Sequence, residues 1–202
     1  FGILSVWRQG RRGADVFARC GISRTFQNIR IFKNLSILDN VLIGVENTRS
    51  DSVFSKVFSF DSSVRQEMYR EAREILAFCG VLNSSQKGAE DMLASSLSYG
   101  FQRKLEIARA IAMKPKLLLL DEPAAGMNPQ ESAELMQLIR DIQQRGITVI
   151  LIEHHMKVVM GISEIVTVLD RGRKIAEGVP DDIADSPVVV SAYLGSDLDS
   201  HG

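Results

Sequence analysis

The stretch that decides the fold runs from residue 117 to residue 123 and reads Leu117-Leu118-Leu119-Leu120-Asp121-Glu122-Pro123. An unbroken apolar run of this length is typical of a buried strand, and the two adjacent acids mark its end. Open sheets of parallel strands bind their ligands at the carboxyl ends of the strands. We therefore expect Asp121 and Glu122 to lie in a ligand site, where one acid holds a metal and the other handles water.

The composition is that of a globular protein without an excess of positive charge. The chain has 202 residues, of which 45% are hydrophobic and 24% charged, and its formal net charge is -1. This length suits one compact domain or a domain with a sizeable lobe. Lysines and arginines are scattered among the acids, a pattern that argues against nucleic acid as a partner. Cys20 and Cys79 form neither a disulfide scaffold nor a metal-spaced cluster with the histidines, so a reducing, intracellular compartment fits.

The sequence contains neither a membrane-spanning apolar run nor a phosphate-binding glycine pattern. The longest uncharged apolar run, 147–152, has the length of a strand, far short of the roughly 20 residues of a membrane-spanning helix. We therefore expect any membrane association to be through a partner. No glycine begins the phosphate-binding pattern Gly-x-x-x-x-Gly-Lys-Ser/Thr. The chain begins with Phe1 and not with Met, and we expect it to be a piece of a longer product.

Strand and helix patterns alternate along the chain. We expect helices over about 36–45, 64–79, 98–112, 129–145 and 156–160, and strands over 21–26, 117–121, 147–152, 165–169 and 174–176. Asn128 is the expected cap of the fourth helix, and a turn at Arg171-Gly172 joins the last two strands. The segment 51–63 is read as a loop or, alternatively, a partner-contacting surface. The order predicts an α/β fold with a largely parallel sheet, interrupted by an inserted helical lobe over 36–112.

The acids at the end of the 117–121 strand suit cleavage of a nucleotide's terminal phosphate. That reaction requires neutralisation of the phosphoryl oxygens, a bridging metal and a group that positions the attacking water. Asp121 is placed to bind Mg²⁺ directly or through water, and Glu122 to take a proton from water. Gln27, also at a strand end, would complete the metal shell with its amide oxygen. The alternatives are a solvated strand end for the acids and an ordinary loop residue for Gln27.

Polar groups elsewhere suit the same substrate. Ser98 and Gly100 begin a helix, where free backbone N–H groups attract an anion and a glycine permits close approach of phosphate. An ordinary serine cap is the alternative for Ser98. His154 and His155 follow the 147–152 strand, and either ring could bind a terminal phosphate or orient Glu122. Nothing in the local sequence chooses between the two histidines.

From about Gly21 to Gly195 these residues, in this order, resemble the nucleotide-binding subunits of ABC transporters. Gln27 resembles the Q-loop glutamine, and His154 the switch histidine. Three segments resemble the other motifs, namely Leu97 to Gln102 the signature peptide, Leu117 to Glu122 the Walker B strand and Ala125 to Asn128 the D-loop. Several sequence segments are similar to those of the branched-chain amino acid importers, among them Arg-Thr-Phe-Gln-Asn, Leu-Glu-Ile-Ala-Arg-Ala and the tail Ala-Tyr-Leu-Gly.

The resemblance implies a fold and its parts. The fold would be a phosphate-loop NTPase-type, mainly parallel sheet with an inserted helical subdomain, all in one partial domain over 1–202. The helical subdomain with the signature would cover about 36–112, the core sheet 113–178, and a carboxy-terminal tail 179–202. The phosphate loop is expected a few dozen residues before Gln27, outside the chain. The family pattern differs here at Phe101, Asn128 and His155, where relatives carry glutamine, aspartate and aspartate.

The resemblance also implies an activity and partners. ATP with Mg²⁺ would lie between two protomers, with Ser98, Gly100 and Gln102 acting on the partner's nucleotide and Asn128 near it. The second ATP-binding subunit would be identical or different, and transmembrane permease subunits, served by a substrate-binding protein, would dock near Gln27 at the cytoplasmic face. Alternatives are an ATPase for another cargo, such as urea, an amide or a lipid, and a non-catalytic binding module. The fragment by itself is expected to bind ATP poorly.

Overall fold

The computed structural model describes residues 14–49, 62–82 and 88–198. By its internal contacts the chain divides into two units, Phe1–Ile152 and Glu153–Gly202. The predicted subdivision at 36–112, 113–178 and 179–202 stays a prediction.

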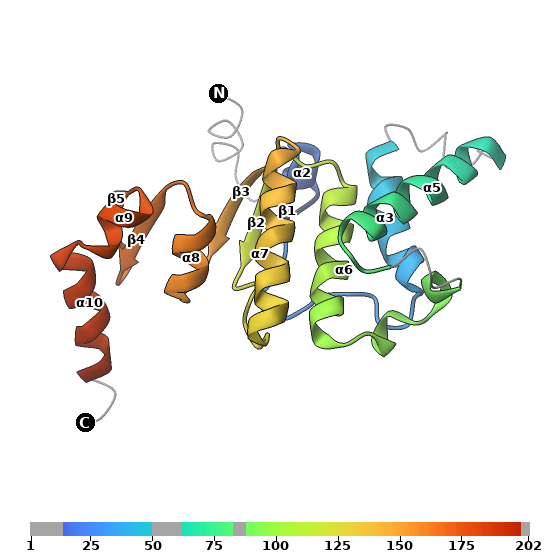
Figure 1. Cartoon of the computed structure of the whole chain (residues 1–202). Helices are drawn as coiled ribbons and strands as arrows, with labels where there is room; N and C mark the ends of the chain where they lie inside the picture. Colours follow the sequence, from blue (N-terminus) through green and yellow to red (C-terminus); the bar gives the residue numbers. More distant parts are fainter. Residues whose placement is uncertain (1–13, 50–61, 83–87, 199–202) are drawn as a thin grey trace. The chain divides into compact units, whose positions relative to one another are not determined.

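The first unit is built on a parallel sheet in which strands distant in sequence are neighbours. Its strands β1 (Ile22–Arg24), β2 (Leu117–Asp121) and β3 (Thr148–Ile152) lie in the order β1-β2-β3, with β2 in the middle (Figure 1). Leu118 and Leu120 of β2 are fully buried. β1 pairs directly with β2 although an interval of helices separates them in the chain, as expected of the predicted fold class, a parallel sheet interrupted by helices.

Strand β1 ends earlier than the sequence predicted. It was expected to reach residue 26, but regular pairing stops at Arg24. The Thr25 N–H still donates to the Leu119 carbonyl, whereas the carbonyls of Phe26 and Gln27 accept hydrogen bonds from the Arg103 side chain. The chain leaves the sheet because these two carbonyls are satisfied by a helix instead of a strand.

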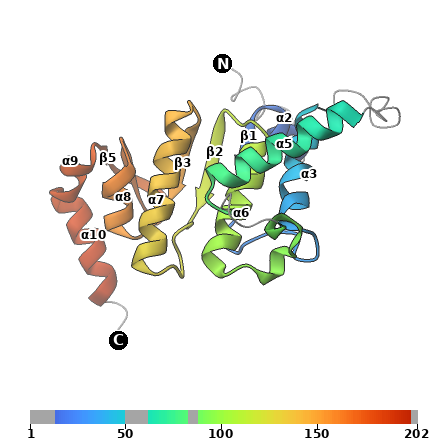
Figure 2. The same ribbon diagram turned by 45° about the vertical axis from the view of Figure 1, so that its right-hand side comes forward.

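The helical lobe contains α3 (Ile37–Arg49), α5 (Ser62–Phe78) and α6 (Tyr99–Ala112), which lie side by side in both ribbon views (Figures 1 and 2). A Cβ on Gly44 of α3 would lie 2.6 Å from the Arg109 carbonyl oxygen and 2.8 Å from Ala112 Cβ. Only a glycine permits this approach of α3 to α6. Within the lobe, the 3-10 turns η1 (Ala89–Asp91) and η2 (Ala94–Ser96) connect α5 to α6. A short helix, α2 (Ala14–Arg19), precedes β1.

The start of α3 agrees with the prediction and its end does not. The Ser36 hydroxyl accepts the Asp39 N–H at 2.9 Å, as expected of a helix start. The helix then continues past the expected end at 45, and the Asn47 and Thr48 side chains hydrogen-bond to carbonyls within it. Of the segment expected to be a loop or contact surface, 51–61 lies outside the described residues, and Ser62 already belongs to α5.

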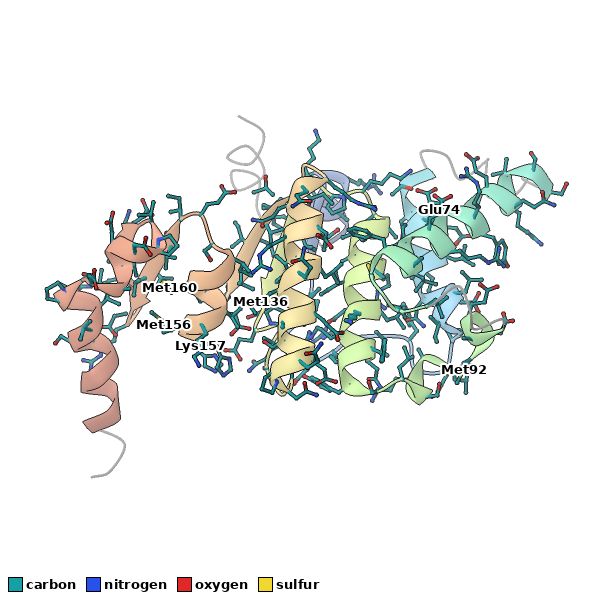
Figure 3. The ribbon with its side chains drawn as sticks, in the orientation of Figure 1. Glu74, Met92, Met136, Met156, Lys157 and Met160 are labelled. Carbon is teal, nitrogen blue, oxygen red and sulfur yellow. The ribbon has the colours of Figure 1, made fainter. Side chains whose placement is uncertain are left out.

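Helix α5 carries ion pairs on its outer side. Glu74, labelled in Figure 3, accepts a hydrogen bond from Arg70 one turn earlier at 2.9 Å. Arg73 donates two hydrogen bonds of 2.8 Å to Glu90, and this pairing lowers the pKa of Glu90. The Arg73–Glu90 pair fastens η1 to α5.

Helix α7 (Pro129–Gln144) follows the β2 acids and contacts β3. The Asn128 side chain accepts the Glu131 N–H at 2.9 Å, while the Glu131 carboxylate accepts the Asn128 N–H at 3.1 Å. This reciprocal capping box confirms Asn128 as the predicted cap. The predicted apolar face is confirmed as well, because its members are all buried: Leu135, Leu138, Ile139 and Ile142.

The second unit contains α8 (Met156–Ile162), the antiparallel hairpin of β4 (Val166–Asp170) and β5 (Arg173–Gly178), and the helices α9 (Pro180–Ala184) and α10 (Pro187–Leu198). Met156, Lys157 and Met160 mark α8 in Figure 3. The hairpin turn at Arg171 and Gly172, both with positive φ, confirms the predicted turn. Among the described residues no helix combines the length and apolarity that a bilayer crossing demands.

Candidate functional site

The two acids of β2 each meet a side chain from the end of β1. Arg24 donates from Nη2 to Asp121 Oδ2 at 2.8 Å, and Gln27 donates from Nε2 to Glu122 Oε2 at 2.9 Å. The contacts follow from the topology, because parallel neighbours deliver their carboxyl ends to the same edge of the sheet. The structure therefore brings together Gln27, Asp121 and Glu122, three of the residues that the sequence proposed.

Glu122 stands at a sharp change in backbone direction. Its φ is +43°, in the left-handed region that non-glycine residues rarely adopt. Its N–H donates to the Ile152 carbonyl at 2.8 Å, so the residue is tied to the end of β3 while its side chain meets Gln27. Such backbone strain costs on the order of 1 kcal/mol and concentrates at functional sites. It supports a working role for this carboxylate.

The donor chemistry at this edge fits a hard divalent cation. Mg²⁺ takes oxygen ligands, and it is usually held by one or two carboxylates together with substrate phosphates. Asp121 supplies a partly exposed carboxylate. Gln27 directs its amide nitrogen to Glu122, so the amide oxygen is the atom through which this side chain could bind a cation. In this structure the cation at the Asp121 carboxylate is the guanidinium of Arg24.

Ser98 stands at the start of a helix, as predicted, but the structure does not show the ordinary serine cap that was the alternative for it. Ser98 occupies the N-cap position of α6, but its side chain makes no capping hydrogen bond. The Ser98 carbonyl accepts the Gln102 N–H at 2.9 Å, which is the first backbone hydrogen bond of the helix, and the Gln102 side chain donates to the Leu97 carbonyl at 2.8 Å. Gln102 therefore folds back over the first turn of the helix.

Gly100 lies where the start of α6 meets the start of α7. A Cβ at this position would lie 2.8 Å from Oε1 of Glu131, the acid of the α7 capping box. Tyr99 packs beside Gly126, at 3.6 Å from where a Cβ on that glycine would be. The starts of α6 and α7 consequently lie together, and four of the predicted site residues belong to them: Ser98, Gly100, Gln102 and Asn128.

Sequence reasoning missed two buried charged residues on α6. Arg103 is 0% exposed and Glu106 3% exposed, and their side chains form an ion pair of 2.8 Å. Charges three residues apart on a helix usually belong to a solvated face. Their spacing with the buried Ile107 and Ala110 is the signal that could have placed them on the inner face.

His154 belongs to the second unit. Its N–H donates to Glu153 Oε2 at 3.3 Å, and its ring centroid lies 4.4 Å from that of His155. His155 Nδ1 lies 3.5 Å from the same Glu153 oxygen. Glu153, His154 and His155 each bring one potential metal-ligand atom, all within 4.8 Å of one another.

The sequence is similar to a known family along most of its length. The ABC transporter family profile matches residues 7–125, and the profile of the branched-chain amino acid ATP-binding cassette transporters matches residues 173–199. The high-affinity branched-chain amino acid transport ATP-binding proteins BraF of Pseudomonas aeruginosa and LivG of Escherichia coli are each 40% identical. In both comparisons the match covers 93% of this chain and 72% of the relative.

Solved structures resemble the fold. An ATP-binding cassette of an ABC transporter in its ADP conformation has a TM-score of 0.72 and 29% identity, covering 91% of this chain and 72% of that one. A nucleotide-free cassette has a TM-score of 0.70 and 28% identity, with 90% and 72% covered. The predicted α/β fold is thereby confirmed.

Proposed function

Because the chain belongs to the ABC transporter family, we propose that it is the ATP-binding and ATP-hydrolysing subunit of an importer for branched-chain amino acids. The observation that carries this proposal is the pairing of Gln27 with Glu122 beside Asp121 at the carboxyl edge of β2. The names of the relatives, which refer to branched-chain amino acid transport, indicate the proposed cargo.

The geometry suggests how the reaction proceeds. Glu122 takes a proton from a water molecule whose oxygen attacks the terminal phosphorus, while the bond to the oxygen of ADP breaks. Gln27 holds the Glu122 carboxylate in place through its amide N–H. Mg²⁺, held by Asp121 and the Gln27 amide oxygen, would neutralise charge on the phosphoryl oxygens. We assign His154 to contact with the terminal phosphate, following the switch histidine that it resembles.

We further propose that two protomers complete each ATP site. Ser98, Gly100 and Gln102 would contact the nucleotide held by the partner, with Asn128 beside it. The first turn of α6 supports this assignment, because Tyr99 and Phe101 are large apolar side chains exposed there. The contact of Gly100 with the Asn128–Glu131 capping box places both helix starts on one surface. A second copy or a homologous ATP-binding subunit would cover it.

The loop after Gln27 suits the docking of permease subunits. Phe26, Phe32 and Leu35 are exposed, and Arg30 and Arg109 stack on the two phenylalanine rings at 4.3 Å and 5.0 Å. An apolar surface rimmed by cations fits a helix from a transmembrane subunit. We therefore place the protein at the cytoplasmic face of the membrane, peripherally bound, with a substrate-binding protein acting only through the permease.

The test of the catalytic assignment is Glu122→Gln in the intact protein. Loss of a general base costs about 10²- to 10⁴-fold in rate, while ATP-driven dimerisation should persist. Glu74→Gln is the matched control, since it removes the same charge from an exposed site on α5. Steady hydrolysis at a near-normal rate in Glu122→Gln would show that Glu122 is not the base.

A lipid cargo is the competing assignment within the family. The lipopolysaccharide export protein LptB of Acidithiobacillus ferridurans is 35% identical over 88% of this chain. The separate match of residues 173–199 to the branched-chain amino acid profile favours amino acids. Uptake of labelled leucine, isoleucine and valine by cells with and without the gene decides between them. Unchanged uptake in the deletion strain would reject the amino acid assignment.

A further inference from the structure

Helix α6, which follows its N-cap residue Ser98, is hydrogen-bonded to the loop that carries Gln27. Arg103, in the second turn of α6, donates from Nη1 to the Phe26 carbonyl and from Nη2 to the Gln27 carbonyl, each at 2.6 Å. The planar guanidinium presents these donors in a rigid fork, so both carbonyls are held in a defined relation to the helix.

Two further side chains of α6 hold the next residues of the loop. Glu106 Oε1 accepts the Arg30 N–H at 3.0 Å, and Arg109 donates to the Arg30 carbonyl. Burial lowers the pKa of Arg109, with Glu106 acting in the opposite direction. The loop 26–30 is thus bonded to one face of one helix at successive turns.

The buried ion pair is not explained by a gain in stability. Replacing a buried ion pair with apolar residues of similar volume is often neutral or stabilising. Among the described residues, Nε of Arg103 also lacks a hydrogen-bond partner, which adds a desolvation cost. What the Arg103–Glu106 pair supplies instead is a fixed geometry between α6 and the loop.

Gln27 is the residue on which this geometry acts. Its carbonyl is held by Arg103 at 2.6 Å, and its side chain donates to Glu122 at 2.9 Å. The same α6 carries Gly100 at its start, against the α7 capping box. A shift of α6 by about 1 Å would therefore stretch the Gln27–Glu122 hydrogen bond beyond its useful length.

We propose that Arg103 is a positioning residue that makes α6 and the loop 26–30 one rigid lever. Contact of a partner protomer with the start of α6 is then transmitted to the Gln27–Glu122 pair. This inference rests on the proposed function for its consequence in hydrolysis. The lever itself is a property of the nucleotide-free protein and is measurable without ATP.

The decisive variant is the double substitution Arg103→Met with Glu106→Leu in the intact protein. It removes both buried charges together, so neither is left unpaired and the fold is expected to survive. Hydrogen exchange of a peptide covering residues 26–31 should accelerate at least about tenfold, because the Arg30 N–H loses its acceptor. Exchange in β2 and α7 should stay unchanged.

Hydrolysis provides a second readout. We expect kcat to fall by about ten- to hundredfold with KM for ATP changed less than about threefold, since a misplacement of 1 Å can cost that much. The control is Lys104→Met with Glu134→Gln, which deletes another ion pair of α6, of 2.7 Å, that does not touch the loop. Arg103→Lys, which lacks the fork, should be intermediate.

The outcomes separate the lever from the proposed function. Unchanged exchange at 26–31 in the double variant, with normal kcat, would overturn the lever. Equal effects in the Lys104 and Glu134 control would also overturn it, because the effect would then be general loosening of α6. If the wild-type protein hydrolyses no ATP but the exchange result holds, the proposed function fails and the lever stands.

Discussion

The side-chain amide of Gln27 lies 2.9 Å from the carboxylate of Glu122 and joins the end of β1 to the end of β2. The same Gln27 is bonded through its carbonyl to Arg103 of α6. One residue therefore connects the reacting edge of the sheet to the helical lobe. This relation makes the position of Glu122 sensitive to changes far from it in the sequence.

Gln27→Ala should slow hydrolysis without abolishing it. The carboxylate of Glu122 loses the donor that orients it, and we expect kcat to fall by about ten- to hundredfold, the scale of a misplaced catalytic group. Steady-state ATPase assays of the intact protein measure the change. Asn47→Ala is the control, because Asn47 is exposed and its side chain donates to the Ile43 carbonyl within α3. Equal rates in Gln27→Ala and wild type would contradict the assigned contact.

Arg24→Gln should tighten binding of the divalent cation. Arg24 competes with a metal for Asp121, and an exposed ion pair of this kind contributes about 0.2–1 kcal/mol, so affinity should rise by at most about fivefold. Titration with Mn²⁺ in the presence of ATP, followed by electron paramagnetic resonance, reports it. Arg70→Gln removes an equal charge from α5 and should leave the titration unchanged. Weaker Mn²⁺ binding in Arg24→Gln would mean that Arg24 assists the metal.

Gly100→Ala should disrupt the cap of α7. The added Cβ would lie 2.8 Å from Glu131 Oε1, so the carboxylate must leave the Asn128 N–H. We expect a loss of about 1 kcal/mol in the free energy of unfolding, as for other caps. The cost should shrink in a Glu131→Ala background, where the clash is absent. Urea denaturation of the four proteins in this cycle measures the coupling, and simple additivity would contradict the contact.

Alkaline pH should destabilise the protein through Cys79. Burial raises the pKa of the Cys79 thiol from 9.0 to about 12, against the weaker pull of Arg145 and Lys104. Between these values the unfolded chain releases the proton and the folded chain retains it, so stability falls as pH rises, by up to about 1.4 kcal/mol per pH unit. Cys79→Ala lacks this dependence. Denaturation of both proteins above pH 9 compares the slopes, and identical slopes would contradict the burial.

Features with a local cause were predictable. The capping box at Asn128, the hairpin turn at Arg171 and the start of α3 at Ser36 depend on hydrogen bonds between residues a few positions apart. Sequence spacing reports such bonds directly. The exceptions were boundaries, where β1 stopped early and α3 ran on, because the competing contacts come from α6 and from within the lobe.

The sequence by itself determined which groups we propose for the reaction, since the Leu117–Glu122 stretch and its order after Gln27 already define a strand end with paired acids. Only the tertiary structure decided which groups hold them. Arg24 meets Asp121 across 97 residues, and Arg103 meets Gln27 across 76. The first contact depends on which strands pair in the sheet, and the second on how a helix packs against the loop after a strand. Sequence periodicity does not encode which elements become neighbours after folding.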